Sequence, residues 1–364
     1  MTSLRNQIDQ AVASAVDRVV QSGDYRCYVG RESEQLEQEL RTMFQHQNQS
    51  HHFLLTNSGT VALELALRSI GVVEGDQVIL SGYDYPGNFW VVQQAKCTPV
   101  LVDVDCDSTR IDLKQLDAAF SNRTRALIVS HLHGQYQPIE SLRKWCDKRG
   151  VVLIEDACQA IGGMLHQQPV GTFGHFALLS FGGSKVISAG RGGALITSDE
   201  RLFQKSKIAA GAGSGAYALS ELSAAVVRAQ LEFLPKINQC SANYFSQIER
   251  ALPPSLNRVY LGRKDSLDAS DDQPAYYQAG WLLQNQQEVQ SVVERLIRLD
   301  LTVGTGFPGF HRRSARRCRT VAELTNTAAL VDRLFTMHFS AAIDPIMEPQ
   351  RIASEIAEAV QCVR

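Results

Sequence analysis

The sequence predicts an α/β protein whose large domain holds a mainly parallel sheet, followed by a smaller α+β domain. With 364 residues, 44% of them hydrophobic, the chain can bury a large core and divide into about two domains. Short apolar runs alternate with helical stretches between residues 53 and 200, a pattern typical of a parallel sheet covered on both faces. A glycine-rich segment at 209–218 then separates off a second unit. We therefore expect an N-terminal arm and large domain at 1–235 and a small domain at 236–364.

Each expected element follows from local pattern. The strands of the large sheet are expected at 77–80, 98–104, 125–131, 151–157, 176–181 and 192–198. Helices fit between them at Gly59–Ile70, Leu113–Phe120 and Ser141–Arg149, and Gly150 would cap the last of these. Leu219–Leu234 has the apolar spacing of one long amphipathic helix. The second unit is expected to hold a loop at 264–274, a strand at 275–283, and helices at 288–299 and 348–363. The N-terminal helix could pack beside this second unit.

Charge and composition exclude several function classes. The net charge is −2, so the whole chain has no electrostatic attraction to nucleic acid or to an anionic membrane. No apolar run reaches the roughly 18 residues that span a bilayer, and the N-terminus lacks a signal-peptide core. We expect a soluble, cytoplasmic protein. The eight cysteines are scattered without a CxxC pair, which favours reduced thiols and predicts no metal centre.

Lys185 lies in a glycine-rich turn of the segment SFGGSKVISAGRGGALIT (180–197), shortly after an apolar strand. A neutral lysine amine can form an imine with a cofactor aldehyde. A surface lysine is the alternative interpretation of Lys185 taken alone.

Asp156 ends the buried strand of VVLIEDACQA, at the edge where ligands bind in open α/β sheets. A buried carboxylate needs a partner, and the protonated pyridine nitrogen of a cofactor is a suitable one. Asp156 could instead cap a following helix.

The segment TNSGTVALELAL (56–67) is a turn that runs into a helix. Free backbone N–H groups and the helix dipole would meet at Ser58, Gly59 and Thr60, as a phosphate monoester requires. An ordinary N-cap is the alternative.

Several motifs in order resemble the DegT/DnrJ/EryC1/StrS family, the sugar aminotransferases of pyridoxal-5′-phosphate (PLP) fold type I. They are YVGRESEQLEQEL (28–40), NSGTVALELAL (57–67), VILSGYDYPGNFWVV (78–92), VLVDVDCDSTRIDLKQLDAAF (100–120), SHLHGQ (130–135), IEDACQA, SFGGSK, GRGGALIT and LSELSAAVVRAQLEFL (219–234). The resemblance covers nearly the whole chain.

The resemblance implies a role for each candidate residue. Lys185 would form a Schiff base with PLP, Asp156 would pair with the pyridine nitrogen, and Gln159 would contact the phenolic oxygen side. Gly59, Thr60 and the Ser180 hydroxyl would hold the phosphate, with Ser58 beside them. Tyr85 would stack on the ring. A homodimer with cofactor sites at or near the subunit interface is also implied.

The sequence departs from the family pattern around the pocket. Where many members have a longer segment with an asparagine that reaches the neighbouring subunit's cofactor phosphate, this chain has Ala216. Arg191 stands between glycines where an acidic residue is usual, and FGGSK lacks a frequent histidine. These differences bear on the substrate more than on the cofactor.

Two further groups of residues have alternative interpretations. The basic cluster at 311–319 could receive a glutamate donor or a nucleotide-sugar diphosphate, or it could be a solvated face. His131 and His133 are expected to pack or form hydrogen bonds near the ring rather than bind a metal.

The expected function is transfer of an amino group from an amino acid, glutamate or glutamine, to a keto group on a sugar, cyclitol or related intermediate. One alternative is elimination or dehydration by the same cofactor, although dehydratase relatives replace the catalytic lysine by histidine. The other is a catalytically silent sensory or scaffold protein. The acceptor cannot be derived from these residues.

Overall fold

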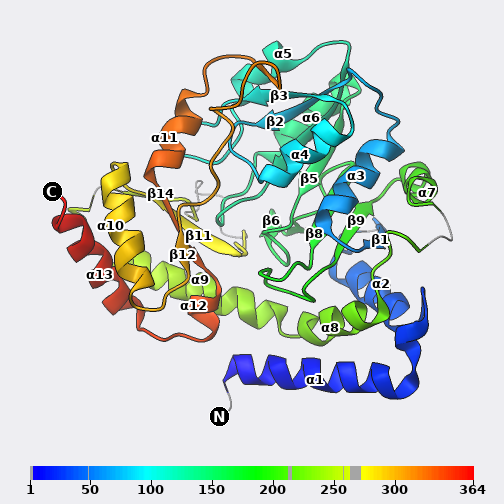
Figure 1. The fold of residues 1–364 in the computed structure, drawn as a ribbon, viewed down its shortest axis with the longest axis horizontal. Coiled ribbons are helices and arrows are strands. Elements are labelled where there is room, and N and C mark those ends of the chain that lie inside the picture. The colour runs from blue at the N-terminus through cyan, green and yellow to red at the C-terminus, as the bar shows by residue number, and fades with distance from the viewer. Residues whose placement is uncertain (1–2, 48, 212–214, 257, 263–271) are drawn as a thin grey trace.

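The computed structural model describes residues 3–364 except 48, 212–214, 257 and 263–271 (Figure 1). Its helices are α1 (Leu4–Ser22), α2 (Arg31–Met43), α3 (Gly59–Ser69), α4 (Pro86–Gln94), α5 (Leu116–Ala119), α6 (Ile139–Arg149), α7 (Glu200–Ala209), α8 (Glu221–Leu231), α9 (Leu234–Ala251), α10 (Gln286–Ile297), α11 (Thr325–Arg333), α12 (Ser340–Ile343) and α13 (Pro349–Gln361), with 3-10 turns η1 (Asp24–Arg26) and η2 (Leu113–Gln115). The strands are β1 (His52–Thr56), β2 (Gln77–Ser81), β3 (Thr98–Val102), β4 (Thr124–Ser130), β5 (Val152–Asp156), β6 (Met164–Leu165), β7 (Gln168–Pro169), β8 (Phe176–Ser180), β9 (Gly193–Thr197), β10 (Val259–Tyr260), β11 (Gln278–Leu282), β12 (Val303–Gly304), β13 (Arg319–Thr320) and β14 (Leu334–His338).

A large, mainly parallel sheet forms the centre of the molecule. Its strand order is β1-β9-β8-β5-β4-β2-β3-β13. The pairs from β8 to β13 are parallel, and β9 pairs antiparallel with both β8 and the edge strand β1. The predicted α/β class and the parallel sheet are confirmed.

Alternate residues of each strand enter different cores on the two faces of the sheet. In β2, Ile79 belongs to the core that also contains side chains of α2 and α6, whereas Val78 and Leu80 belong to the core that contains side chains of α3 and α4. All three side chains are fully buried. Because both faces are covered, these strands are continuous apolar runs, and that is why the sequence shows them clearly.

A second, antiparallel sheet of order β10-β11-β14-β12 lies in the C-terminal part of the chain. It packs with α9, α10 and α13 around a separate core (Figure 1). The short strand β13, however, pairs with β3 in the large sheet. The division into 1–235 and 236–364 remains a proposal, and its boundary falls in the first turn of α9.

Two expectations about helices are wrong. Leu219–Leu234 is not one helix, because α8 ends at Leu231 and α9 begins at Leu234. Pro235 lacks a backbone N–H and suits the first turn of a helix, so it favours a new start there. The N-terminal helix α1 packs along α8 rather than beside the C-terminal sheet (Figure 1).

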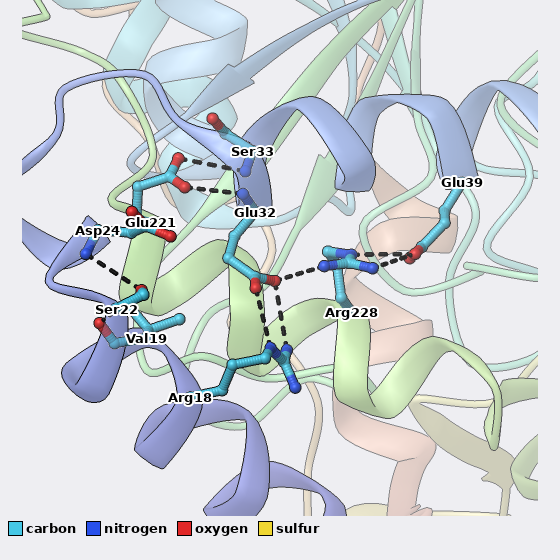
Figure 2. Close-up of polar contacts among 9 residues, drawn as sticks. All are labelled: Arg18, Val19, Ser22, Asp24, Glu32, Ser33, Glu39, Glu221 and Arg228. Atoms are coloured by element: carbon cyan, nitrogen blue, oxygen red, sulfur yellow. Dashed lines mark hydrogen bonds and ion pairs between the residues drawn. The ribbon is translucent and has the colours of Figure 1, made fainter.

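A partly buried polar network links the N-terminal arm to α8 (Figure 2). Glu32 of α2, only 3% exposed, accepts from Arg18 of α1 (3.2 Å) and from Arg228 of α8, which also binds Glu39 (2.8 Å). The carboxylate of Glu221 accepts the backbone N–H of Glu32 at 2.8 Å and so satisfies a free donor at the start of α2. These contacts therefore hold α1, α2 and α8 together. No helix in the described part of the chain has the length and apolar character needed to cross a bilayer.

Candidate active site

The candidate site is a cavity of about 380 Å³ at the carboxyl edge of the parallel strands. Because β4, β5 and β8 end there and α3 begins there, residues distant in sequence meet. All eight predicted candidates line this cavity: Ser58, Gly59, Thr60, Tyr85, Asp156, Gln159, Ser180 and Lys185.

The start of α3 forms one wall. Ser58 caps the helix, since its hydroxyl accepts the N–H of Val61 at 3.1 Å, and the first-turn amides after it have no intrahelical partner. A Cβ on Gly59 would lie 3.1 Å from the Cβ of Ser180, and a Cβ on Gly193 would lie 2.5 Å from the Gly59 nitrogen. These two glycines let the helix start pack directly against the ends of β8 and β9. The N-cap interpretation of Ser58 is confirmed, and the capped helix start also borders the cavity, while phosphate binding stays a prediction.

Asp156 is 6% exposed and accepts three hydrogen bonds. One carboxylate oxygen accepts from Asn88 Nδ2 (3.0 Å) and Ser130 Oγ (3.2 Å), and the other accepts from the backbone N–H of Cys158 (3.0 Å). These contacts fix the orientation of the carboxylate at the edge of the cavity.

Asp84, which the sequence did not single out, lies behind Asp156 and is fully buried. Its Oδ1 accepts from Ser130 Oγ, from the backbone N–H of Tyr85 (2.7 Å) and from Asn88 Nδ2 (3.3 Å). Burial, and then the negative charge of Asp156, raise the pKa of Asp84 to about 7. The motif GYDYPGNF held a signal for this pair, since Asp84 and Asn88 are four residues apart where a turn enters a helix.

The Nζ of Lys185 lies 4.4 Å from the centre of the Tyr277 ring. The Tyr277 hydroxyl bonds Ser184 Oγ (2.9 Å), and Nε2 of His338 donates to the Ser184 carbonyl (2.9 Å). Burial lowers the pKa of His338, and the charge of Lys185 lowers it further. Side chains beside the second sheet thus hold the turn that carries Lys185. Neither Tyr277 nor His338 was predicted from the sequence, because each comes from a segment distant from Lys185.

The remaining cavity wall supplies an amide and aromatic rings. Gln159 is 6% exposed, and its Oε1 has no hydrogen-bond partner among the described residues. Tyr85 precedes α4, is 43% exposed, and meets Phe307 edge-on with ring centres 5.8 Å apart.

Of the other residues singled out from the sequence, only Arg191 lines the cavity. None of 311–319 lines the cavity; Arg316, Arg317 and Arg319 border a separate hollow at the amino end of β3. The segment around Ala216 lies close to the cavity, because Asn57 donates its N–H to the Tyr217 carbonyl at 2.8 Å. The adjoining 212–214 lie outside the described residues.

The two flagged histidines form hydrogen bonds within the fold. His131 bonds Glu155 (3.0 Å) and His133 bonds the Tyr83 hydroxyl (2.8 Å). In the described ranges, no group of three or more His, Cys, Asp or Glu side chains is arranged to hold a metal ion.

A sequence model of the DegT/DnrJ/EryC1/StrS aminotransferase family matches residues 6–357. The chain belongs to this family. L-glutamine:2-deoxy-scyllo-inosose aminotransferase of Streptomyces kanamyceticus is 36% identical over 194 residues, 52% of this chain and 45% of that protein. The chain spans about half the length of the curated relatives it matches.

Solved structures superpose on nearly the whole chain. 3-Amino-5-hydroxybenzoic acid synthase superposes with a TM-score of 0.84 at 25% identity over 97% of each chain. An E. coli GDP-4-keto-6-deoxy-D-mannose-3-dehydratase with bound hydrated PLP gives a TM-score of 0.78 at 16% identity over 96% of each chain, which shows a shared fold alone.

Proposed function

We propose that the protein is a PLP-dependent aminotransferase that moves an amino group from glutamate or glutamine to a keto group of a sugar, cyclitol or related biosynthetic intermediate. The observation that carries the proposal is the meeting of Lys185, Asp156 and the start of α3 in one cavity. Membership of an aminotransferase family supports it, as does the relative that acts on L-glutamine and an inosose.

The donor set of the cavity fits PLP. Lys185 supplies a primary amine that, among the described residues, makes a ring contact and no hydrogen bond or ion pair. The Oε1 of Gln159 is buried without a partner, which suggests that the amide is placed for a bound molecule. The amides at the start of α3, together with Ser180, suit a phosphate.

When bound, PLP supplies a carbonyl carbon that exchanges an amino group and a ring that takes up electron density. The Lys185 Nζ would hold that carbon and, once displaced by an incoming amine, would take the proton from the substrate carbon. The Asp156 carboxylate would hold a proton on the ring nitrogen. Gly59, Thr60 and Ser180 would bind the phosphate, with Ser58 fixing the helix start, while Gln159 and Tyr85 would orient the ring.

We also propose a homodimer. Tyr28 and Val29 are 79% and 69% exposed and border an apolar hollow with Tyr217. Exposed apolar side chains that adjoin each other favour a protein interface. The cytoplasmic location stays a prediction from the sequence.

The direct test is the absorption spectrum of the PLP-loaded protein during titration with glutamate. We expect the visible cofactor band to bleach as the pyridoxamine form accumulates, and a keto acceptor to restore it. A band that no amino acid changes would refute amino transfer. Loss of water from the intermediate, with no 2-oxoglutarate formed from glutamate, would instead favour the dehydration alternative, which the fold shared with a dehydratase leaves open.

A further inference from the structure

Two carboxyl groups, Asp84 and Asp156, share their hydrogen-bond donors at the base of the cavity. β4 lies between β2 and β5 in the sheet, so Ser130 at its end reaches Asp84, which follows β2, and Asp156, which ends β5. Asn88 of α4 donates to the same pair, at 3.3 Å and 3.0 Å. The two carboxyl groups are thus linked through two side chains.

The donors do not suffice for two buried negative charges. A serine hydroxyl has one proton and can serve only one carboxylate at a time, whereas the amide of Asn88 can serve both. The Oδ2 of Asp84 has no partner among the described residues. Asp84 is 0% exposed, so water does not supply a donor to its Oδ2, whereas Asp156 borders the cavity. Two like charges in such a place favour retention of one proton by the pair.

We propose that Asp84 is a positioning residue that acts through Asp156. When a cationic cofactor ring nitrogen binds Asp156, the proton of Asp84 is released to solvent, and the negative charge left on Asp84 strengthens that ion pair. The inference rests on the proposed function, in which the ligand is PLP or its pyridoxamine form. A positive charge at Asp156 would let both carboxyl groups ionise, and by linkage ionised Asp84 strengthens cofactor binding.

The other titratable groups that face Asp84 do not replace it in this role. Cys158 beside Asp156 has a pKa raised by burial and by both carboxylates. The pKa of Tyr83, next to Asp84, is raised by burial. Both stay neutral between pH 6 and pH 8. Lys185 and the cofactor's own titratable groups are present in every variant below. Their contribution to the pH dependence of the affinity is therefore nearly the same in each and largely cancels when variants are compared.

The test is the affinity of the apoprotein for pyridoxamine 5′-phosphate at pH 6 and pH 8. This probe has no aldehyde and so forms no covalent bond with Lys185. With a pKa of about 7 in the free protein, Asp84 is mostly protonated at pH 6 and mostly ionised at pH 8. The wild type should therefore gain about tenfold more affinity than Asp84→Asn over this interval. Asp9→Asn, the same change on exposed α1, should behave as the wild type.

Ser130→Ala provides a second, independent variant. It removes a donor that lowers the pKa of Asp84, so the pH midpoint of the affinity change should rise. Equal pH dependence in the wild type and in folded Asp84→Asn would overturn the proposal. If Asp84→Asn does not fold, an unmoved midpoint in Ser130→Ala would overturn it instead. A wild type that binds neither PLP nor the probe would refute the proposed function, and this inference with it.

Discussion

Asp156→Asn separates the charge of this side chain from its shape. The aspartate accepts three hydrogen bonds, from Asn88, Ser130 and the backbone of Cys158. An amide replaces one acceptor oxygen by a donor NH₂. In either orientation of the amide, at least one buried donor then faces another donor, which should cost about 1–3 kcal/mol of unfolding free energy.

The functional loss in Asp156→Asn should be larger than the loss of stability. An opposite charge at contact distance shifts a pKa by about 1–3 units. Without the carboxylate, and at a pH above the pKa of the ring nitrogen, the protonated fraction of that nitrogen would be about 10- to 1000-fold smaller. We expect the half-reaction with glutamate to slow by a similar factor while the cofactor band persists.

Rapid mixing with glutamate, followed at the visible cofactor band, measures this rate, and thermal unfolding checks the fold. Asp9→Asn is the matched control because it makes the same chemical change at an exposed position. A folded, cofactor-bearing Asp156→Asn that reacts at the wild-type rate would show that the carboxylate does not hold the ring proton.

Three further predictions follow. Lys185→Ala should lose the visible cofactor band yet keep the fold, because the side chain is only partly buried; a retained band, or borohydride labelling of another lysine in the wild type, would reassign the site. Burial lowers the pKa of His133 to about 3, so below pH 6.5 the unfolded chain binds a proton that the folded protein excludes. This group should lower the free energy of unfolding by about 1.4 kcal/mol per pH unit as the pH drops from 6.5 toward 3. In a His133→Phe variant, unfolding measured at pH 7, 6 and 5 should show a shallower dependence of that free energy on pH. An equal dependence in both proteins would show that His133 is not the cause. Light scattering at micromolar concentration should give twice the 40.2 kDa chain mass, whereas a single-chain mass with PLP bound would contradict the dimer.

The sequence identified the large sheet well because its strands are buried on both faces. The run predicted at 176–181 became β8 (Phe176–Ser180), and 151–157 became β5 (Val152–Asp156). β1 (His52–Thr56) was missed because it lies at the sheet edge, where three of its five residues are only partly buried. β14 (Leu334–His338) was missed as well, although it pairs with β11 and β12 within the second sheet. A five-residue apolar run next to a helix gives no periodicity to tell strand from helix.

For the cavity, the sequence could indicate residues at strand ends and helix starts, because parallel strands bring those positions to one edge. It could not indicate Asn88 or Ser130, whose importance depends on which carboxylates face them. Tyr277 also could not be predicted, because its contact with Lys185 depends on how the second sheet packs on the first. The 264–274 loop prediction falls mostly on 263–271, outside the described residues.

The most direct measurement of the central claim follows the nitrogen itself. The PLP-loaded protein would be mixed with glutamate labelled with ¹⁵N at its amino group. The released cofactor and keto acid would then be identified and quantified by mass spectrometry. Amino transfer in the Lys185 cavity predicts one equivalent each of ¹⁵N-labelled pyridoxamine 5′-phosphate and 2-oxoglutarate per active site, and neither product from Lys185→Ala. The experiment would be repeated with glutamine labelled at its α-amino group. If the wild type gave unlabelled cofactor with both donors, or if Lys185→Ala gave fully labelled cofactor, the account would be contradicted.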